Sequence, residues 1–374
     1  MKVPFVHLGD VHLGGLLSGG LAGRQVAERR AEALATLQKC LKYIQEHKIP
    51  LLFVAGDLFE YETTSRQTVM ELCNMLDAIS PTHVFIAAGN HDYAAANSFY
   101  RTLNWPANVH LFLDDWQSVH LPEFAVTVHG MGFTTPELTS RHLQEYQIAN
   151  DDRLHVIILH ADLISGVSDS RYLPIHRNDL QQCGADYIAL GHIHKPQVVL
   201  ESDGKAVAAY CGALEPMRFG EEGEHGFYHG QLAAGGADLQ FVPMATRSYH
   251  TKTVDITGCQ TTENVISHIT EALNNISPKD LVSVVLTGHI DTDFYIEKDR
   301  IEQAGADFYH FQMRDETQPA YDLEELAKGF TARAVFVRRM QALLATAEGE
   351  QKDEVRLALH LGLQALSGQE VRLP

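Results

Sequence analysis

The sequence has 374 residues, of which 45% are hydrophobic and 21% charged, so the chain can bury a sizeable core and is neither disordered nor collagen-like. Its 48 acidic side chains outnumber 29 Lys and Arg, and the formal net charge of −19 argues against a protein that holds nucleic acid through an overall basic surface. Five scattered cysteines form no Cys-x-x-Cys pair, and no apolar run approaches the ~18 residues of a membrane span, which favours a cytoplasmic protein without a membrane partner.

The first part of the chain alternates between apolar strands and amphipathic helices. The predicted strands VPFVHLGD, LLFVAGD and HVFIAAGNHD end at Asp10, Asp57 and Asn90, and the first is expected to be a strand rather than a signal peptide. Helices are predicted over 24–47 and 66–79. The apolar stripe of the first helix consists of Leu34, Leu37, Leu41 and Ile44. This β-α-β-α-β order predicts parallel strands joined by right-handed crossovers.

The next part is rich in strands with no clear helix between them. The segments AVTVHGMGF, HVIILHAD, DYIALGHIH, AVAAYCG, GFYHGQL and DLQFVP predict a second, more antiparallel sheet. The expected fold of residues 1–245 is therefore an α/β sandwich of two sheets with helices outside, in α-β-β-α layers. A reset of the pattern predicts a small α+β capping domain over 249–314, and apolar residues at helical spacing predict a helical tail over 322–374.

Side chains with metal-ligand chemistry follow the ends of five predicted strands. They lie in Asp10-Val11-His12, Gly56-Asp57, Gly89-Asn90-His91-Asp92, His160 and Gly191-His192-Ile193-His194. The carboxyl ends of parallel strands meet at the edge of the sheet where sites form. Residues two apart on an extended chain also point the same way, so both ends of D-x-H or H-x-H can reach one centre. We therefore expect these side chains to converge on one rim.

The ligand types and their number indicate two divalent ions. Carboxylate, amide and imidazole ligands together suit an ion such as manganese better than zinc alone. The seven candidates are Asp10, His12, Asp57, Asn90, His160, His192 and His194. They are too many for one ion that keeps an open position, and enough for two ions that share a carboxylate. Two-metal sites, with ions ~3.5–4 Å apart, clamp the attacking and leaving oxygens of a phosphoryl transfer.

The order D-x-H, G-D, G-N-H-D, H and G-H-x-H resembles the signature of the calcineurin-like metallophosphoesterase superfamily. Within it, AGNHD, DYIALGHIHKPQ and YCGALEP are similar to the SbcD-type DNA repair exonucleases, bacterial relatives of the meiotic recombination eleven nuclease, and to their YhaO-like branch. The resemblance covers residues 1 to about 245 and extends more weakly through the capping domain and the tail.

The resemblance implies a role for each candidate ligand. Asp10, His12 and His194 hold the first metal, Asn90, His160 and His192 hold the second, and Asp57 bridges them. A metal-bound hydroxide is then expected to attack the phosphate. Manganese is the expected ion in both positions.

Three further residues receive roles from the same resemblance. His91 is expected to stabilise the phosphate or protonate the leaving oxygen, and Asp92 to orient His91. Glu60 occupies a position where nucleases of the family often carry His or Asp, so it is expected in the substrate neighbourhood. The usual Ser or Ala before the first Asp is Gly9 here, a change of little expected consequence.

The resemblance also implies a substrate and partners. The chain is expected to be a DNA exonuclease or endonuclease in DNA repair that acts with an SbcC-like coiled-coil ATPase. The ATPase would dock on the tail, which is locally basic at Lys328, Arg333, Arg338 and Arg339. A homodimer is expected through helices near 66–79 and 94–103. Its apolar patch, which could equally be core, comprises Leu72, Met75, Leu76, Phe99 and Leu103.

Two alternatives stay open. The acidic composition favours an enzyme for small phosphodiesters or phosphomonoesters with no role on DNA, although such enzymes rarely need a capping domain and a tail. The second alternative is a non-catalytic scaffold that kept the fold, and the complete set of candidate ligands counts against it. The histidines outside the motifs are expected at the surface; they are His155, His176, His225, His229, His289 and His310.

Overall fold

A computed structural model of the chain describes residues 2–15, 20–21, 23–149, 151–166, 170–291 and 294–366. The chain forms two compact units. The first comprises residues 1–251 with 277–283 and 307–312, and the second comprises 252–276, 284–306 and 313–374. The three-part division predicted from the sequence stays a prediction, and residues 367–374 of the predicted tail lie outside the described residues.

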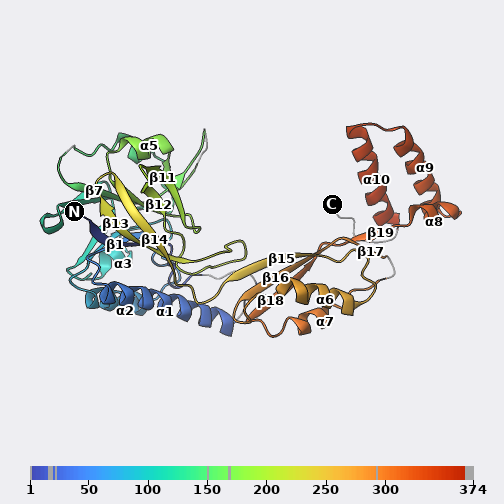
Figure 1. Ribbon diagram of the computed structural model, residues 1–374, viewed down its shortest axis with the longest axis horizontal. Coiled ribbons are helices and arrows are strands. Elements are labelled where there is room, and N and C mark those ends of the chain that lie inside the picture. Colours follow the sequence, from blue (N-terminus) through green and yellow to red (C-terminus); the bar gives the residue numbers. More distant parts are fainter. Residues whose placement is uncertain are drawn as a thin grey trace. The chain divides into compact units, whose positions relative to one another are not determined.

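Four parallel strands begin the large sheet of the first unit. They are β1 (Val3–Leu8), β2 (Leu51–Ala55), β3 (His83–Ala87) and β4 (Val109–Phe112), in the order β4-β3-β2-β1. Helices α1 (Arg24–Glu46) and α2 (Arg66–Ala78) connect them and lie together in Figure 1. The hydroxyl of Ser65 starts α2 by accepting the amide N–H of Thr68. The predicted β-α-β-α-β order is therefore confirmed, with both helices within one residue of their expected ends.

The other half of the sheet is more parallel than predicted. It contains β5 (Gln117–Leu121), β6 (Val126–Gly130), β7 (Leu154–His160), β10 (Tyr187–Gly191), β11 (Gln197–Ser202) and β12 (Lys205–Tyr210). Strands β6, β7, β10 and β12 pair parallel, whereas β5 and β11 pair antiparallel with β6 and β12. The connections β6–β7 and β7–β10 contain no long crossover helix, only the short helices α4 (His142–Glu145) and α5 (Arg177–Gln182).

The two halves form the predicted α-β-β-α sandwich, although hydrogen bonds join them into one path. Strands β13 (Gly226–Ala233) and β14 (Gly236–Pro243) link β1 to β12. Aromatic residues of the first half pack against aliphatic residues of the second, and this inner core includes Phe5, Phe53, Phe85, Val128, Val156 and Ile158. The outer face of the first half is covered by α1 and α2 through Leu37, Leu41, Ile44 and Leu72.

Short elements complete the first unit. They are α3 (Phe99–Thr102), the 3-10 turn Pro122–Phe124, β8 (Asp162–Leu163) and β9 (Pro174–Ile175). The apolar residues considered for a dimer patch belong to the core or pack on it. Leu72 and Leu76 are buried, and Met75, Phe99 and Leu103 are partly buried against them. Dimerisation therefore has no support from this patch.

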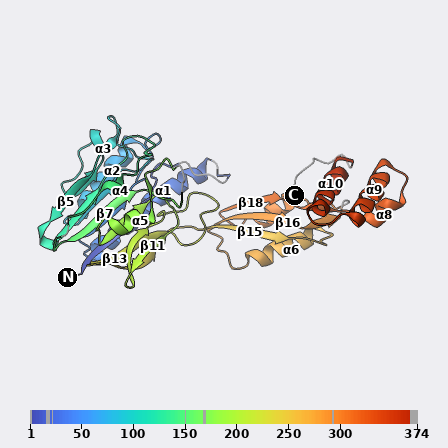
Figure 2. The same cartoon turned by 90° about the horizontal axis from the view of Figure 1, so that it is seen from above.

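A three-stranded sheet has the order β15 (Tyr249–Asp255), β16 (Leu281–Thr287), β18 (His310–Asp315), and α6 (Thr262–Leu273) lies beside it in Figure 2. Helix α7 (Lys298–Ala304) and the strand pair β17 (His289–Asp291) and β19 (Gln318–Ala320) follow. The C-terminal helices are α8 (Leu323–Lys328), α9 (Ala332–Thr346) and α10 (Glu350–Leu366), with α9 packed on α10. Among the described residues, none of these helices is both long and apolar enough to cross a bilayer.

Two of the histidines expected at the surface are buried. The Nδ1 atom of His155 lies 2.9 Å from Nε2 of His129, and the His225 ring lies 3.1 Å from the carbonyl of Ala213. Each ring has a polar partner inside the fold, so burial costs little.

Candidate metal centre

The candidate ligands come from five strand ends at one edge of the sandwich. In the parallel pairs, Leu8 of β1 lies opposite Val54 of β2, and Gly191 of β10 lies opposite His160 of β7. The segments that follow these strands are also tied to one another, because the amide of His12 donates to the carbonyl of Asp57 at 2.9 Å. Parallel pairing therefore brings together side chains that are up to 184 positions apart, Asp10 and His194 being the extremes.

The backbone is strained at this edge. Eight non-glycine residues in the described part of the chain have positive φ, and four of them are candidate ligands. They are Asp10 and His12 with φ of 48°, Asp57 with 50° and His192 with 101°. Such conformations are unfavourable for residues with a Cβ and persist where the surrounding structure enforces them, which is typical of functional sites.

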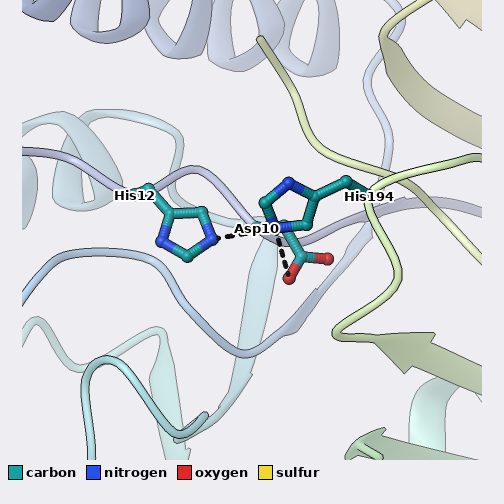
Figure 3. Close-up of side chains that lie close together, drawn as sticks. All are labelled: Asp10, His12 and His194. Carbon is teal, nitrogen blue, oxygen red and sulfur yellow. Dashed lines mark hydrogen bonds and ion pairs between the residues drawn. The ribbon is translucent and has the colours of Figure 1, made fainter. Parts of the chain in front are cut away.

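The first group of ligands consists of Asp10, His12 and His194. The Nε2 atoms of His12 and His194 lie 3.2 Å apart, and Oδ1 of Asp10 lies 4.0 Å from Nε2 of His194. Figure 3 shows the two imidazole rings and the carboxylate directed toward one another. Asp10 and His12 are buried, and the His194 side chain is 21% exposed, so the group is reached from one side.

The second group surrounds His160. Its Nε2 atom lies 2.9 Å from Oδ1 of Asn90, 3.2 Å from Oδ2 of Asp57 and 3.3 Å from Nδ1 of His192. The same Asp57 oxygen lies 3.7 Å from Nε2 of His12. Asp57 therefore stands between the two groups, where the bridging role would place it.

The donor atoms fit cations in both groups. The Nδ1–H of His12 donates to Glu60 and that of His194 to Glu221, at 2.8 and 3.0 Å. In the neutral rings the two Nε2 atoms are then lone pairs, and lone pairs 3.2 Å apart repel unless a proton or cation lies among them. The same holds for His160, whose Nδ1–H donates to the carbonyl of Ala55 at 3.0 Å and whose Nε2 faces the Asp57 carboxylate.

Burial and neighbouring charges shift the pKa values of Asp10, Asp57 and His160. Burial raises the pKa of the Asp10 carboxyl. Burial acts the same way on Asp57, but the positive charge of His160 and their hydrogen bond hold the pKa of Asp57 below its usual range. Burial opposes the charged form of His160, yet the carboxylates of Asp57 and Asp10 raise its pKa to about 9. In the metal-free chain a proton on His160 thus balances Asp57, and a divalent cation can take over that role.

His91 lies at the rim, where it forms a third group of possible donors with His12 and Glu60. Its side chain is 46% exposed, its backbone N–H donates to Oδ1 of Asp57 at 2.8 Å, and its Nδ1 lies 2.8 Å from Oε2 of Glu60. The hydrogen bond to Glu60 raises the pKa of His91 to about 8. An exposed imidazole beside a cation site can hold a phosphate oxygen or a proton.

The structure gives Asp92 other partners than the predicted one. Its buried carboxylate accepts hydrogen bonds from the amides of Gly89 and Leu58, at 2.6 and 2.7 Å, and from the hydroxyl of Tyr100 at 2.7 Å. Asp92 is turned back into the loop after β3 and shapes that loop. The carboxylate that contacts the His91 ring is Glu60.

Sequence reasoning missed Glu221. Its Oε1 accepts from His194, and its Oε2 accepts the amide of Met217 at 2.8 Å. The hydrogen bond from His194 overcomes the effect of burial and lowers the pKa of Glu221 to about 2. The segment between β12 and β13 carries no ligand motif, so only the path of the chain reveals this contact.

Comparisons with known proteins identify relatives of this chain. The family model described as calcineurin-like phosphoesterase matches residues 3–196. The metallophosphoesterase YhaO of Bacillus subtilis, itself described as uncharacterized, is 26% identical over 259 residues, which cover 66% of this chain and 61% of the relative. The DNA double-strand break repair protein Mre11 of Methanopyrus kandleri is 24% identical over 341 residues, covering 82% of this chain and 72% of the relative.

Two more matches extend the set. The SbcD component of the nuclease SbcCD of Escherichia coli is 24% identical over 246 residues, covering 54% of this chain and 59% of the relative. The chain thus spans about three fifths of the length of YhaO and of SbcD. A dimetal phosphatase from Danio rerio superposes with a TM-score of 0.40 and 13% identity, covering 62% of this chain and 92% of the other.

Proposed function

Because the chain belongs to the calcineurin-like phosphoesterase family, we propose that it is a metal-dependent phosphodiesterase of the SbcD type that cuts DNA with manganese. The observation that carries the proposal is that Oδ2 of Asp57 lies 3.7 Å from Nε2 of His12 in one donor group and 3.2 Å from Nε2 of His160 in the other, with the exposed ring of His91 beside them. The likeness to Mre11 and to the SbcD component of SbcCD, whose names are those of DNA repair and nuclease proteins, supports DNA as the substrate.

Each residue of the site has a separate proposed role. Asp10, His12 and His194 would hold one cation, Asn90, His160 and His192 the other, and Asp57 would contact both. When bound, the cations supply Lewis acidity toward the phosphate and lower the pKa of water. His91 would bind a phosphate oxygen or carry the proton that the leaving oxygen needs, because its side chain is 46% exposed and Glu60 engages only its Nδ1.

The experiment that tests this function is nucleotide release from end-labelled duplex DNA with Mn²⁺, beside Asp57→Asn as the control. The expected result is metal-dependent release that the variant loses while keeping its circular dichroism spectrum. Cleavage of a chromogenic phosphodiester without any cleavage of DNA would favour the alternative, an enzyme for small phosphoesters, which the net charge of −19 also favours.

The partner belongs to the same proposal. An SbcC-like ATPase could supply the basic DNA surface that this chain lacks in its overall charge, and the C-terminal helices offer it a face. Helix α9 buries Val337 and Met340 against α10 while Val335 and Leu343 are 54% and 46% exposed. Removing residues 323–374 is expected to abolish co-purification with a co-expressed SbcC-like ATPase, and unchanged co-purification would refute this docking site.

A further inference from the structure

One carboxylate joins a candidate metal ligand to His91. Oε1 of Glu60 lies 2.8 Å from Nδ1 of His12, and Oε2 lies 2.8 Å from Nδ1 of His91. The two rings meet edge to face, with centroids 4.8 Å apart and planes at 84°. Each oxygen of Glu60 thus serves one ring.

This contact places a hydrogen on Nδ1 of both histidines. An ionised carboxylate only accepts hydrogen bonds, so each Nδ1 must carry the hydrogen. The Nε2 atom of His12 is then left as a lone pair directed at the cation site, 3.2 Å from His194 and 3.7 Å from Asp57. The Nε2 atom of His91 is likewise left for the substrate. Carboxylates that hold ligand histidines in this way tune metal affinity in other metalloproteins.

The fold holds Glu60 in place. Its amide donates to the carbonyl of Leu13 at 3.0 Å, which ties the segment after β2 to the segment after β1. The amide of Tyr61 donates to the carbonyl of His91 at 2.8 Å, and this bond ties the same segment after β2 to the loop after β3. The Glu60 side chain is 18% exposed, so it has little freedom to move toward solvent.

We propose that Glu60 is a positioning residue that couples the cation bound by His12 to the orientation of His91. Both of its oxygens are engaged by histidines, so it acts on the substrate through His91 and not by direct contact. The proposal rests on the proposed function for its effect on hydrolysis, but not for its effect on the two rings.

Glu221 offers a matched control. It holds Nδ1 of His194, a ligand in the same group as His12, at 3.0 Å. Its second oxygen accepts a backbone amide, that of Met217, where Glu60 accepts a second histidine. Replacing Glu221 therefore weakens the support of a ligand without touching the contact to His91.

The experiment compares Glu60→Gln with Glu221→Gln, each alone and combined with His91→Ala, in the full chain. A glutamine has one acceptor and one donor group, so it can accept from only one of the two rings. Calorimetry measures the affinity for Mn²⁺. The protonation of the histidine ring nitrogens is followed by ¹⁵N NMR of the protein loaded with diamagnetic Zn²⁺. Turnover is measured on a chromogenic phosphodiester at saturating Mn²⁺.

Both single variants are expected to bind Mn²⁺ roughly 10- to 100-fold more weakly. Only Glu60→Gln is expected to shift the ring nitrogens of His91, and it is expected to lower turnover at saturating Mn²⁺ more than Glu221→Gln does. The double variant with Glu60→Gln and His91→Ala is expected to have nearly the same turnover as His91→Ala alone. In the double variant with Glu221→Gln and His91→Ala, the effects of the two substitutions on turnover are expected to be additive.

Unchanged His91 nitrogen signals in Glu60→Gln would overturn the coupling, as would loss of one bound Mn²⁺ per chain in this variant at saturating metal, because Glu60 would then be a ligand. These two measurements need no hydrolysis. If the wild-type chain hydrolyses no phosphodiester, the proposed function fails, and the metal titration and NMR spectra still decide the role of Glu60.

Discussion

The Nε2 atoms of His12 and His194 face each other at 3.2 Å, while the opposite nitrogen of each ring is held by a glutamate. Two imidazoles arranged in this way cannot hydrogen-bond to each other as neutral rings, because both facing nitrogens are acceptors. A proton or a cation between the two nitrogens removes this repulsion, and a bound cation can take the place of the proton. Metal binding and folding stability must be linked.

The first prediction follows from that linkage. Adding Mn²⁺ to chelator-treated protein is expected to raise the melting temperature, since a ligand present at 100 times its dissociation constant adds about 2.7 kcal/mol to the free energy of unfolding. Asp10→Asn should lose most of this increase because it removes a buried carboxylate of the first group. Differential scanning fluorimetry measures both, and a melting temperature indifferent to Mn²⁺ in the wild type would contradict the metal centre.

The role of His91 can be separated from metal binding. His91→Ala is expected to keep the Mn²⁺ content of the wild type and to lose roughly 10²- to 10⁴-fold in turnover, as expected for a proton-transfer residue. The control variant is His47→Ala, because His47 is exposed and stacks on Tyr43 with ring centroids 3.8 Å apart. This variant should change neither the Mn²⁺ content nor the turnover. Full turnover in His91→Ala would remove this residue from the mechanism.

Gly89 makes room for Asp57. A Cβ at position 89 would collide with Oδ1 of Asp57 and lie 2.6 Å from its backbone nitrogen. Gly89→Ala is therefore expected to displace Asp57, to weaken Mn²⁺ binding and to lower the free energy of unfolding by about 1–3 kcal/mol. Gly329→Ala is the control, because its Cβ would make an ordinary 3.5 Å contact with Ala334. Calorimetry with Mn²⁺ and urea denaturation check both, and equal Mn²⁺ affinities in the two variants would be inconsistent with this packing.

Glu215 of the YCGALEP segment belongs to a buried ion pair. Glu215 is buried, accepts the guanidinium of the equally buried Arg29 at 3.0 Å and accepts the hydroxyl of Thr36 at 2.6 Å. Glu215→Ala should lower the free energy of unfolding by about 1–3 kcal/mol, because it leaves buried donors of Arg29 and Thr36 without this acceptor while Glu32 still pairs with Arg29 at 2.6 Å. Glu46→Ala, which breaks the exposed pair with Lys42, should leave the urea midpoint unchanged. Similar midpoints for the two variants would show that the buried pair contributes nothing.

The sequence predicts which side chains converge at this edge, because strand ends and local spacing determine their positions. Asp10 and His12, or His192 and His194, are two apart after apolar runs, and the parallel order of the strands then brings them to one edge. The parallel pairing of β6, β7 and β10 was not predicted, since loops with very short helices replace the usual crossover helix. The contacts of Glu60 and Glu221 depend on the path of loops, which local pattern does not encode. The buried pairing of His155 with His129 joins two neighbouring strands, so it too depends on tertiary structure.

The last prediction concerns acid stability away from the metal centre. Burial lowers the pKa of His7 to about 3, and its Nδ1 lies 2.8 Å from the hydroxyl of Tyr187. In the unfolded chain a histidine has a pKa of about 6.5. Between these values the unfolded chain binds a proton that the folded chain does not. The free energy of unfolding therefore falls by about 1.4 kcal/mol per pH unit from this residue as the pH drops below 6.5.

His7→Asn should flatten this dependence, because asparagine keeps a polar atom near Tyr187 but does not titrate. Urea denaturation between about pH 4.5 and 6.5, where the unfolded histidine gains its proton, measures the difference in slope. Tyr187→Phe is the control: it removes the hydrogen bond and should lower stability at every pH while keeping the slope of the wild type. Parallel curves for His7→Asn and the wild type would mean that His7 takes up its proton without unfolding, so that its burial does not set the acid limit of the fold.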